Sequence, residues 1–212
     1  MTYSIHPMCK EDVVQVTEID REAFPSQLPP ANYNQELQNH LARYIIACND
    51  SITVDESEVK PAKRLTRLAP IIKRWFGQTP SPINESPAPA RQYIVGFAGI
   101  WVMAEEAHIT NIAVRTRYQR RGIGELLLIS IIDVAKELKA INMTLEVRIS
   151  NTTAQNLYLK YGFVQMGIRR GYYLDNREDG LIMSTESITS ASFQAHFQQL
   201  RETLARKLDL SG

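Results

Sequence analysis

The sequence predicts a three-layer α/β domain. Short apolar runs typical of strands alternate with segments whose apolar residues recur at helical spacing, from residue 3 to residue 184. The clearest unit lies at residues 108–128, where a strand at 109–114 passes through a turn into a helix. A chain of 212 residues with 44% hydrophobic content is long enough for one substantial core.

The individual elements follow from apolar periodicity and from residues that end helices. Strands are expected at 3–7, 44–48, 92–103, 108–114, 143–147, 163–169 and 181–184. Helices are expected at 11–24, 34–41, 122–139 and 151–161. In the first helix Val13, Val16, Ile19 and Ala23 share one face, and Pro25 ends it. The strands at 92–103 and 108–114 are expected to form a hairpin.

Residues 50–91 have a different composition and are interpreted as an insertion between two strands. Their middle, 60–76, has no acidic residue and six basic ones, namely Lys60, Lys63, Arg64, Arg67, Lys73 and Arg74. Apolar residues near helical spacing predict a basic amphipathic helix there, followed by a proline-rich return. Such a helix either binds ribosomal RNA, an anionic membrane surface or an acidic protein, or packs its apolar stripe on its own domain.

The end of the chain predicts one more helix. Residues 189–208 carry an apolar stripe of Phe193, Phe197, Leu200, Leu204 and Leu208. We therefore expect a single domain at 1–188, including the insertion, and a C-terminal helical extension at 189–212. The stripe favours packing on the core or on a dimer mate, which leaves the oligomeric state open.

The unit at 108–128 has the features of a phosphate-binding turn. Unpaired N–H groups at a helix start and its partial positive charge suit a diphosphate on the amides of 120–125. Arg117, Arg120 and Arg121 add charge. A P-loop is excluded because Glu125 and Leu126 follow the last glycine, where a P-loop has a lysine and a serine or threonine. A dinucleotide-binding fold is excluded because this segment lacks the third glycine of that motif. An ordinary glycine-containing turn with a solvated basic face is the alternative.

The longer pattern points to a family. The segment Gln119-Arg120-Arg121-Gly122-Ile123-Gly124, following Asn111-Ile112-Ala113-Val114, resembles motif A of the GCN5-related N-acetyltransferases, the GNAT family. The resemblance covers roughly residues 3–48 and 92–184. It implies a mixed sheet that splays open beside motif A and acetyl-CoA as cosubstrate. The implied binding residues are Ile112, Ala113, Val114, Gln119, Arg120, Arg121, Gly122, Ile123, Gly124, Glu125 and Asn151.

A second set of residues narrows the resemblance. The segments Leu145-Glu146-Val147-Arg148, 169–173 and 177–179 are similar to the RimI-type enzymes, which acetylate the N-terminal alanine of a small-subunit ribosomal protein. The similarity implies direct transfer from acetyl-CoA to a protein α-amino group in a ternary complex. It also implies that loops at 25–33 and 169–179 line a peptide groove, with Tyr172 and Tyr173 in its wall.

Amide formation requires a neutral amine. An α-amino group is already roughly a quarter neutral at neutral pH, whereas a lysine is about a thousandfold less available, so modest base help suffices for an N-terminus. By position and spacing the resemblance implies Glu146 as general base, acting through a water, and Tyr158 as the acid that protonates the leaving thiolate. Val114 is a candidate backbone N–H for the oxyanion. An exposed strand-end carboxylate and a core aromatic are the competing interpretations.

The bulk properties exclude several other classes. A net charge of +1 has no nucleic-acid signature, and the chain start has neither a basic n-region nor an apolar h-region. We therefore expect a soluble cytoplasmic protein. Cys9 and Cys48 are too few for a disulfide framework, and the four scattered histidines lack ligand spacing, so no metal is inferred. Acetylation of a lysine or a small-molecule amine, and a noncatalytic acyl-CoA-binding module, remain as alternative functions.

Overall fold

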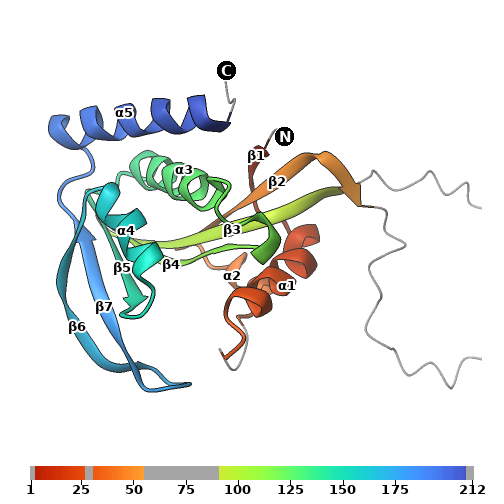
Figure 1. The fold of residues 1–212 in the computed structure, drawn as a ribbon, viewed down its shortest axis with the longest axis horizontal. Helices are drawn as coiled ribbons and strands as arrows, with labels where there is room; N and C mark the ends of the chain where they lie inside the picture. Colours follow the sequence, from red (N-terminus) through yellow and green to blue (C-terminus); the bar gives the residue numbers. More distant parts are fainter. Residues whose placement is uncertain (1–2, 27–30, 55–90, 209–212) are drawn as a thin grey trace, which may run out of the picture.

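The computed structural model describes residues 3–26, 31–54 and 91–208 and confirms a mixed α/β fold (Figure 1). A seven-stranded sheet has the order β1-β2-β3-β4-β5-β7-β6. Only β4 and β5 are parallel neighbours; the other adjacent pairs are antiparallel. The strands are β1 (Tyr3–Pro7), β2 (Ala42–Val54), β3 (Arg91–Met103), β4 (Glu106–Val114), β5 (Asn142–Arg148), β6 (Phe163–Tyr173) and β7 (Glu178–Thr185).

Helices cover both faces of the sheet (Figure 1). They are α1 (Val13–Ala23), α2 (Tyr33–Glu36), α3 (Ile123–Glu137), α4 (Thr152–Lys160) and α5 (Ala191–Leu208). Strand residues alternate between two cores, because successive side chains of a strand point to opposite faces. In β2, Ile45 and Ala47 join the core under α3, whereas Ile46 joins the core under α1 and α2. These two cores give the three layers that the sequence predicts.

Several segments differ from expectation. β6 continues to Tyr173 and β7 begins at Glu178, so most of the loop expected at 169–179 belongs to a strand hairpin. β2 continues to Val54 and β3 begins at Arg91, and these two residues are register partners, so the strands extend into the segment assigned to the insertion. The predicted basic helix and proline-rich return fall on residues 55–90, outside the described residues. The helix expected at 34–41 is a single turn, α2, because turns at 37–41 lead directly into β2.

The sheet splays between β4 and β5. Their pairing extends only from Glu106 to Ile109 on β4. Thr110 follows as an extra residue in the pairing with β3, a β-bulge that bends the strand. Beyond it β4 runs on to Val114 without β5 beside it, so the bulge opens the gap that the family resemblance implies.

The C-terminal helix α5 packs on this core. Phe197 and Leu204 are buried in the cluster that also contains the apolar face of α3. Figure 1 shows α5 outside α3, next to the start of that helix. Of the two packing modes expected for the stripe, the structure has the intramolecular one. Within the described ranges, no helix is long and apolar enough to cross a membrane.

Candidate active site

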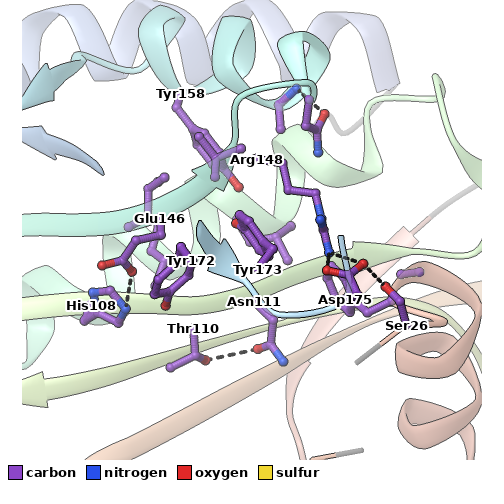
Figure 2. Close-up of a pocket in the computed structure, with 18 of the residues that line it drawn as sticks. Ser26, His108, Thr110, Asn111, Glu146, Arg148, Tyr158, Tyr172, Tyr173 and Asp175 are labelled. Carbon is purple, nitrogen blue, oxygen red and sulfur yellow. Dashed lines mark hydrogen bonds and ion pairs between the residues drawn. The ribbon is translucent and has the colours of Figure 1, made fainter. Parts of the chain in front are cut away.

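A cavity of about 450 Å³ lies in the splay. β4 and β5 form its sides, and the start of α4, the hairpin of β6 and β7, and the end of α1 complete the wall (Figure 2). Both residues expected to be catalytic, Glu146 and Tyr158, line it. Both residues expected in the peptide groove, Tyr172 and Tyr173, line it as well.

Glu146 is a nearly buried carboxylate with two cationic or polar partners. Leu145 and Val147 on either side point into the core under α3, so strand alternation directs Glu146 to the opposite face. Its side chain is 6% exposed; Oε2 lies 3.2 Å from Nε2 of His108, and Oε1 lies 3.2 Å from a guanidinium nitrogen of Arg169. These contacts hold the carboxylate in one orientation at the edge of the cavity.

Tyr158 enters the same cavity from α4, and Figure 2 shows its hydroxyl pointing inward. Its ring packs 5.7 Å from that of Phe163, and burial raises the pKa of the hydroxyl to about 12. The group is therefore a neutral O–H donor at physiological pH. Asn151 lines the cavity at the start of α4 and caps that helix, since its Oδ1 accepts from the N–H of Ala154 at 3.1 Å.

The turn before α3 has the geometry of an anion site. Gly122 is the N-cap at φ 85°, and Arg120 has φ 59°, two left-handed residues that fold the chain tightly before the helix. The first N–H groups of α3 have no intrahelical acceptor. A Cβ on Gly124 would meet only Cγ2 of Val114 at 3.8 Å, so this face of the helix start is open. Ile123 is 1% exposed, which leaves only its backbone for a ligand.

The polar residues of this turn divide into two groups. Glu125 does not face a ligand freely, because its carboxylate accepts from the hydroxyl of Tyr161 at 2.7 Å and pairs with Lys160. Gln119 donates to the carbonyl oxygen of Val114 at 3.3 Å and so closes the turn onto β4. Arg120 and Arg121 are exposed beside the helix start, where their charge adds to that of the helix N-terminus.

The backbone of β4 beyond the bulge faces the gap at alternate residues. The N–H of Arg115 donates to the carbonyl oxygen of Val95 at 2.9 Å. In an antiparallel ladder this bond turns the N–H and C=O of the preceding residue, Val114, away from β3. By the same alternation, the backbone N–H and C=O of Ile112 point toward the gap, and those of Ala113 hydrogen-bond to β3. Of the three β4 residues expected to hold the cosubstrate, two therefore present their backbone to it.

A chain of polar contacts from Arg148 through Asp175 to Ser26, here called the charged bridge, closes the cavity on the side away from Glu146. Arg148 binds both carboxylate oxygens of Asp175, at 3.0 and 2.9 Å, and lies 3.9 Å above the ring of Tyr173. Asp175 accepts from the hydroxyl of Ser26 at 2.5 Å, which links the β6–β7 hairpin to the end of α1 (Figure 2). The bridge spans the side of the cavity where the sequence predicts the peptide groove.

Among the described residues of the 25–33 loop, Ser26 lines the cavity. Tyr33, in the 25–33 loop, does not line the cavity: it is 1% exposed, and its hydroxyl donates to the buried Asp20 at 2.7 Å. Residues 27–30 of that loop fall outside the described part of the chain.

Sequence reasoning gave no role to His108 or Arg148, and it placed Ser26, Asp175 and Arg169 in the site only as members of loops expected to line the groove. The sequence pattern could have pointed to His108, because it is a polar residue between the buried residues Ala107 and Ile109 of a strand. That alternation places its side chain on the open face of the sheet, the face that Glu146 occupies one strand away.

Comparisons with known proteins agree with this fold. The model described as "Acetyltransferase (GNAT) family" matches residues 13–163. An N-alpha-acetyltransferase of Sulfurisphaera tokodaii is 30% identical over 86% of this chain and 92% of its own length. The chain therefore belongs to the GNAT acetyltransferase family, whose cosubstrate is acetyl-CoA.

Other relatives are more similar over a shorter stretch. A putative ribosomal protein bS18-alanine N-acetyltransferase of Bacillus subtilis is 46% identical over 43% of this chain. The enzyme named for the same activity in Escherichia coli is 43% identical over 43% of this chain. The matches span 60% and 63% of those relatives' lengths.

Solved structures show the same fold. The ribosomal-protein-S18-alanine N-acetyltransferase from Escherichia coli has a TM-score of 0.61 at 24% identity, covering 90% of this chain and 97% of its own. A GNAT acetyltransferase from Elizabethkingia anophelis with acetyl-CoA bound has a TM-score of 0.58 at 20% identity, covering 87% and 97% of the two chains.

Proposed function

We propose that this protein transfers the acetyl group of acetyl-CoA to the N-terminal α-amino group of a protein, in a ternary complex. By similarity to the named relatives, the acceptor is an N-terminal alanine of a ribosomal protein. The observation that carries the proposal is the pairing of two groups in one cavity: the held carboxylate of Glu146 and the neutral hydroxyl of Tyr158. A proton acceptor and a proton donor in one small cavity suit transfer between an amine and a thioester.

The residues at the splay fit acetyl-CoA. The open face at Gly124 and the free N–H groups of the first turn of α3 would hold its diphosphate. The backbone groups of Ile112 face the gap and would pair with the amide-bearing arm, whereas the carbonyl oxygen of Val114 accepts from Gln119 and its N–H is left to face the gap. Asn151, at the start of α4, adds a side-chain amide to the same cavity. Once bound, acetyl-CoA supplies an acyl carbon activated by its thioester.

The protein's own residues would then accept and donate the protons of the reaction and stabilise the charge that develops on the acyl oxygen. Glu146 accepts a proton from the incoming amine through a water, and its contacts with His108 and Arg169 keep the carboxylate aimed. Tyr158 is a buried donor for the leaving sulfur. The N–H of Val114 is a donor for negative charge that develops on the acyl oxygen.

The acceptor side favours a narrow chain end. Tyr172 and Tyr173 stand at right angles with their centroids 5.1 Å apart, and the bridge from Arg148 through Asp175 to Ser26 closes the wall beside them. A main-chain N-terminus with a small first side chain would enter beside this wall with its amine directed at Glu146.

Mass spectrometry on matched peptides tests the acceptor. Each peptide carries one internal lysine and begins with alanine, either free or blocked at the α-amine, and is incubated with acetyl-CoA. We expect one acetyl group on the free α-amine and none on the blocked peptide. Acetylation of the lysine in both peptides would replace the proposal by a side-chain acetyltransferase. Tight acetyl-CoA binding without transfer to any amine would indicate the noncatalytic module.

Two variants test the roles. Glu146→Gln and Tyr158→Phe should each lower kcat by about 100-fold to 10,000-fold, the usual range for general acid or base help, while acetyl-CoA binding is retained. Glu186→Gln, which neutralises an exposed carboxylate outside the cavity, is the matched control. Losses below about threefold in both variants would assign Glu146 and Tyr158 to structure.

A further inference from the structure

Polar side chains form a continuous path from Glu146 to the surface. Nε2 of His108 lies 3.2 Å from Oε2 of Glu146, a contact visible in Figure 2, and Nδ1 of His108 lies 3.0 Å from the hydroxyl of Thr144. That hydroxyl in turn donates to Oε1 of Glu106 at 3.0 Å. The path begins at a side chain that is 6% exposed and ends at an exposed residue.

The sheet aligns these four residues. β4 and β5 are parallel neighbours here, and His108 and Thr144 are register partners. Glu106 lies two residues before His108, and Glu146 lies two residues after Thr144, so all four side chains point to the same face. The path therefore follows the last paired stretch of β4 and β5 before the sheet splays open.

The donors and acceptors along this path can be fully hydrogen-bonded in two protonation states that hold the same number of protons. In the first, Glu146 and His108 share a proton, Nδ1–H of His108 donates to Thr144, and Thr144 donates to an ionised Glu106. In the second, a protonated Glu106 donates to Thr144, Thr144 donates to Nδ1, and Nε2–H donates to an ionised Glu146. Each proton moves along one bond between the states, which is the requirement for a proton relay.

The proposed reaction produces a proton that must leave. An ammonium and a thioester give an amide, a thiol and one proton: the N–C bond forms, the C–S bond breaks, and its electron pair goes to sulfur, which is protonated. We propose that His108, Thr144 and Glu106 conduct this proton from Glu146 to solvent; the inference rests on the proposed acetyl transfer. These three residues act through Glu146 and are positioning residues.

The other groups around Glu146 favour this direction of flow. Arg169 of β6 pairs with its second oxygen and keeps its own charge, so it stabilises the carboxylate after the proton has left. Tyr172, also on β6, stays a neutral phenol, because burial and then the charge of Glu146 raise its pKa. The β7 residue opposite Glu146 is Ile182, which cannot carry a proton.

Variants of Thr144 isolate the relay. Thr144→Val keeps the branched shape but removes the hydroxyl, and Thr144→Ser keeps the hydroxyl. We expect kcat of Thr144→Val to fall about 10-fold or more, part of the usual acid–base contribution, with KM for peptide and acetyl-CoA unchanged. Thr144→Ser should stay within about threefold of wild type. Glu106→Gln, which cannot take up the proton, should resemble Thr144→Val.

Proton release provides a readout that a structural role would not change. Single turnovers in weak buffer with a pH indicator compare the appearance of protons in solution with the formation of acetyl peptide. The two should coincide in wild type and in Thr144→Ser. In Thr144→Val, protons should lag behind the product, or both should slow until added imidazole buffer restores the rate.

The outcomes separate this inference from the function on which it rests. An active wild type with equal kcat and coincident traces in the valine and serine variants would overturn the relay alone. Equal losses in both variants, without rescue by buffer, would also overturn it and leave His108 and Thr144 as a cross-strand pair. A wild type that acetylates no amine would overturn the proposed function, and the relay with it.

Discussion

Replacement of Gly124 by glutamate should separate folding from ligand binding. The position of its Cβ is open, with only Val114 within 3.8 Å, so the side chain can be added without a clash. Gly124 lies in the first turn of α3, where a residue other than glycine and a negative charge are both favourable, together by about 1 kcal/mol. The variant should therefore fold and melt at the same or a slightly higher temperature.

The same change should oppose the diphosphate of acetyl-CoA. A carboxylate about 5 Å from one phosphate charge, at an effective dielectric constant of about 20, costs about 3 kcal/mol. That energy corresponds to a loss of affinity of roughly 100-fold. Because the repulsion is electrostatic, the loss should shrink as the salt concentration rises. Gly124→Gln adds the same bulk without the charge and isolates the steric part.

Isothermal titration with acetyl-CoA, combined with thermal unfolding of each variant, measures both effects. The expected pattern is retained stability with weak binding in Gly124→Glu and intermediate binding in Gly124→Gln. If folded Gly124→Glu bound acetyl-CoA as tightly as wild type, the diphosphate would not lie at this helix start, and the assignment of the turn would be wrong.

Three further predictions concern the rest of the fold. Leu204→Ala should lower the free energy of unfolding by about 2–5 kcal/mol in chemical denaturation, because Leu204 is buried between α5 and the core, whereas exposed Lys207→Ala should be near neutral. Hydrogen bonds from Ser150, and then Arg148, lower the pKa of Glu178 to about 2 from 4.5, so its stabilisation is present above pH 4.5 and is lost as the pH falls toward 2; Glu178→Gln should flatten this part of the stability profile. Replacing residues 55–90 by a four-residue Gly/Ser turn should leave peptide acetylation intact, because Val54 and Arg91 are already paired. A loss of activity on ribosomal substrate alone, which shrinks at high salt, would identify an anionic partner. An equal loss of activity on peptide and ribosomal substrate would assign the segment to the fold.

The turn before α3 was predictable because its information is local. A strand, two glycines and the apolar face of one helix lie within 21 consecutive residues, 108–128, and backbone preference with helical periodicity is enough to order them. The order of strands and helices and the stripe of the C-terminal helix follow from the same local patterns. The extents of β2 and β3 do not, since pairing across the sheet decided where each of them ends. The early end of α2 does not either, because turns at 37–41 lead into β2.

Backbone direction within β4 also came from the structure. Ile112, Ala113 and Val114 are adjacent in sequence, yet only the first and third face the gap, because the register with β3 commits the middle residue. The bulge at Thr110 that frees this part of β4 from β5 has no marker in the sequence.

By itself, then, the sequence determined the α/β class, the family, the turn before α3 and the two residues expected to be catalytic. Only the tertiary structure brought His108, Arg169 and Glu146 together from three strands, and joined Ser26 to Asp175 across 149 positions. These contacts depend on which strands become neighbours and in which register, and burial of the two cores sets both. Local sequence propensity carries no information about contacts between residues so far apart in the chain.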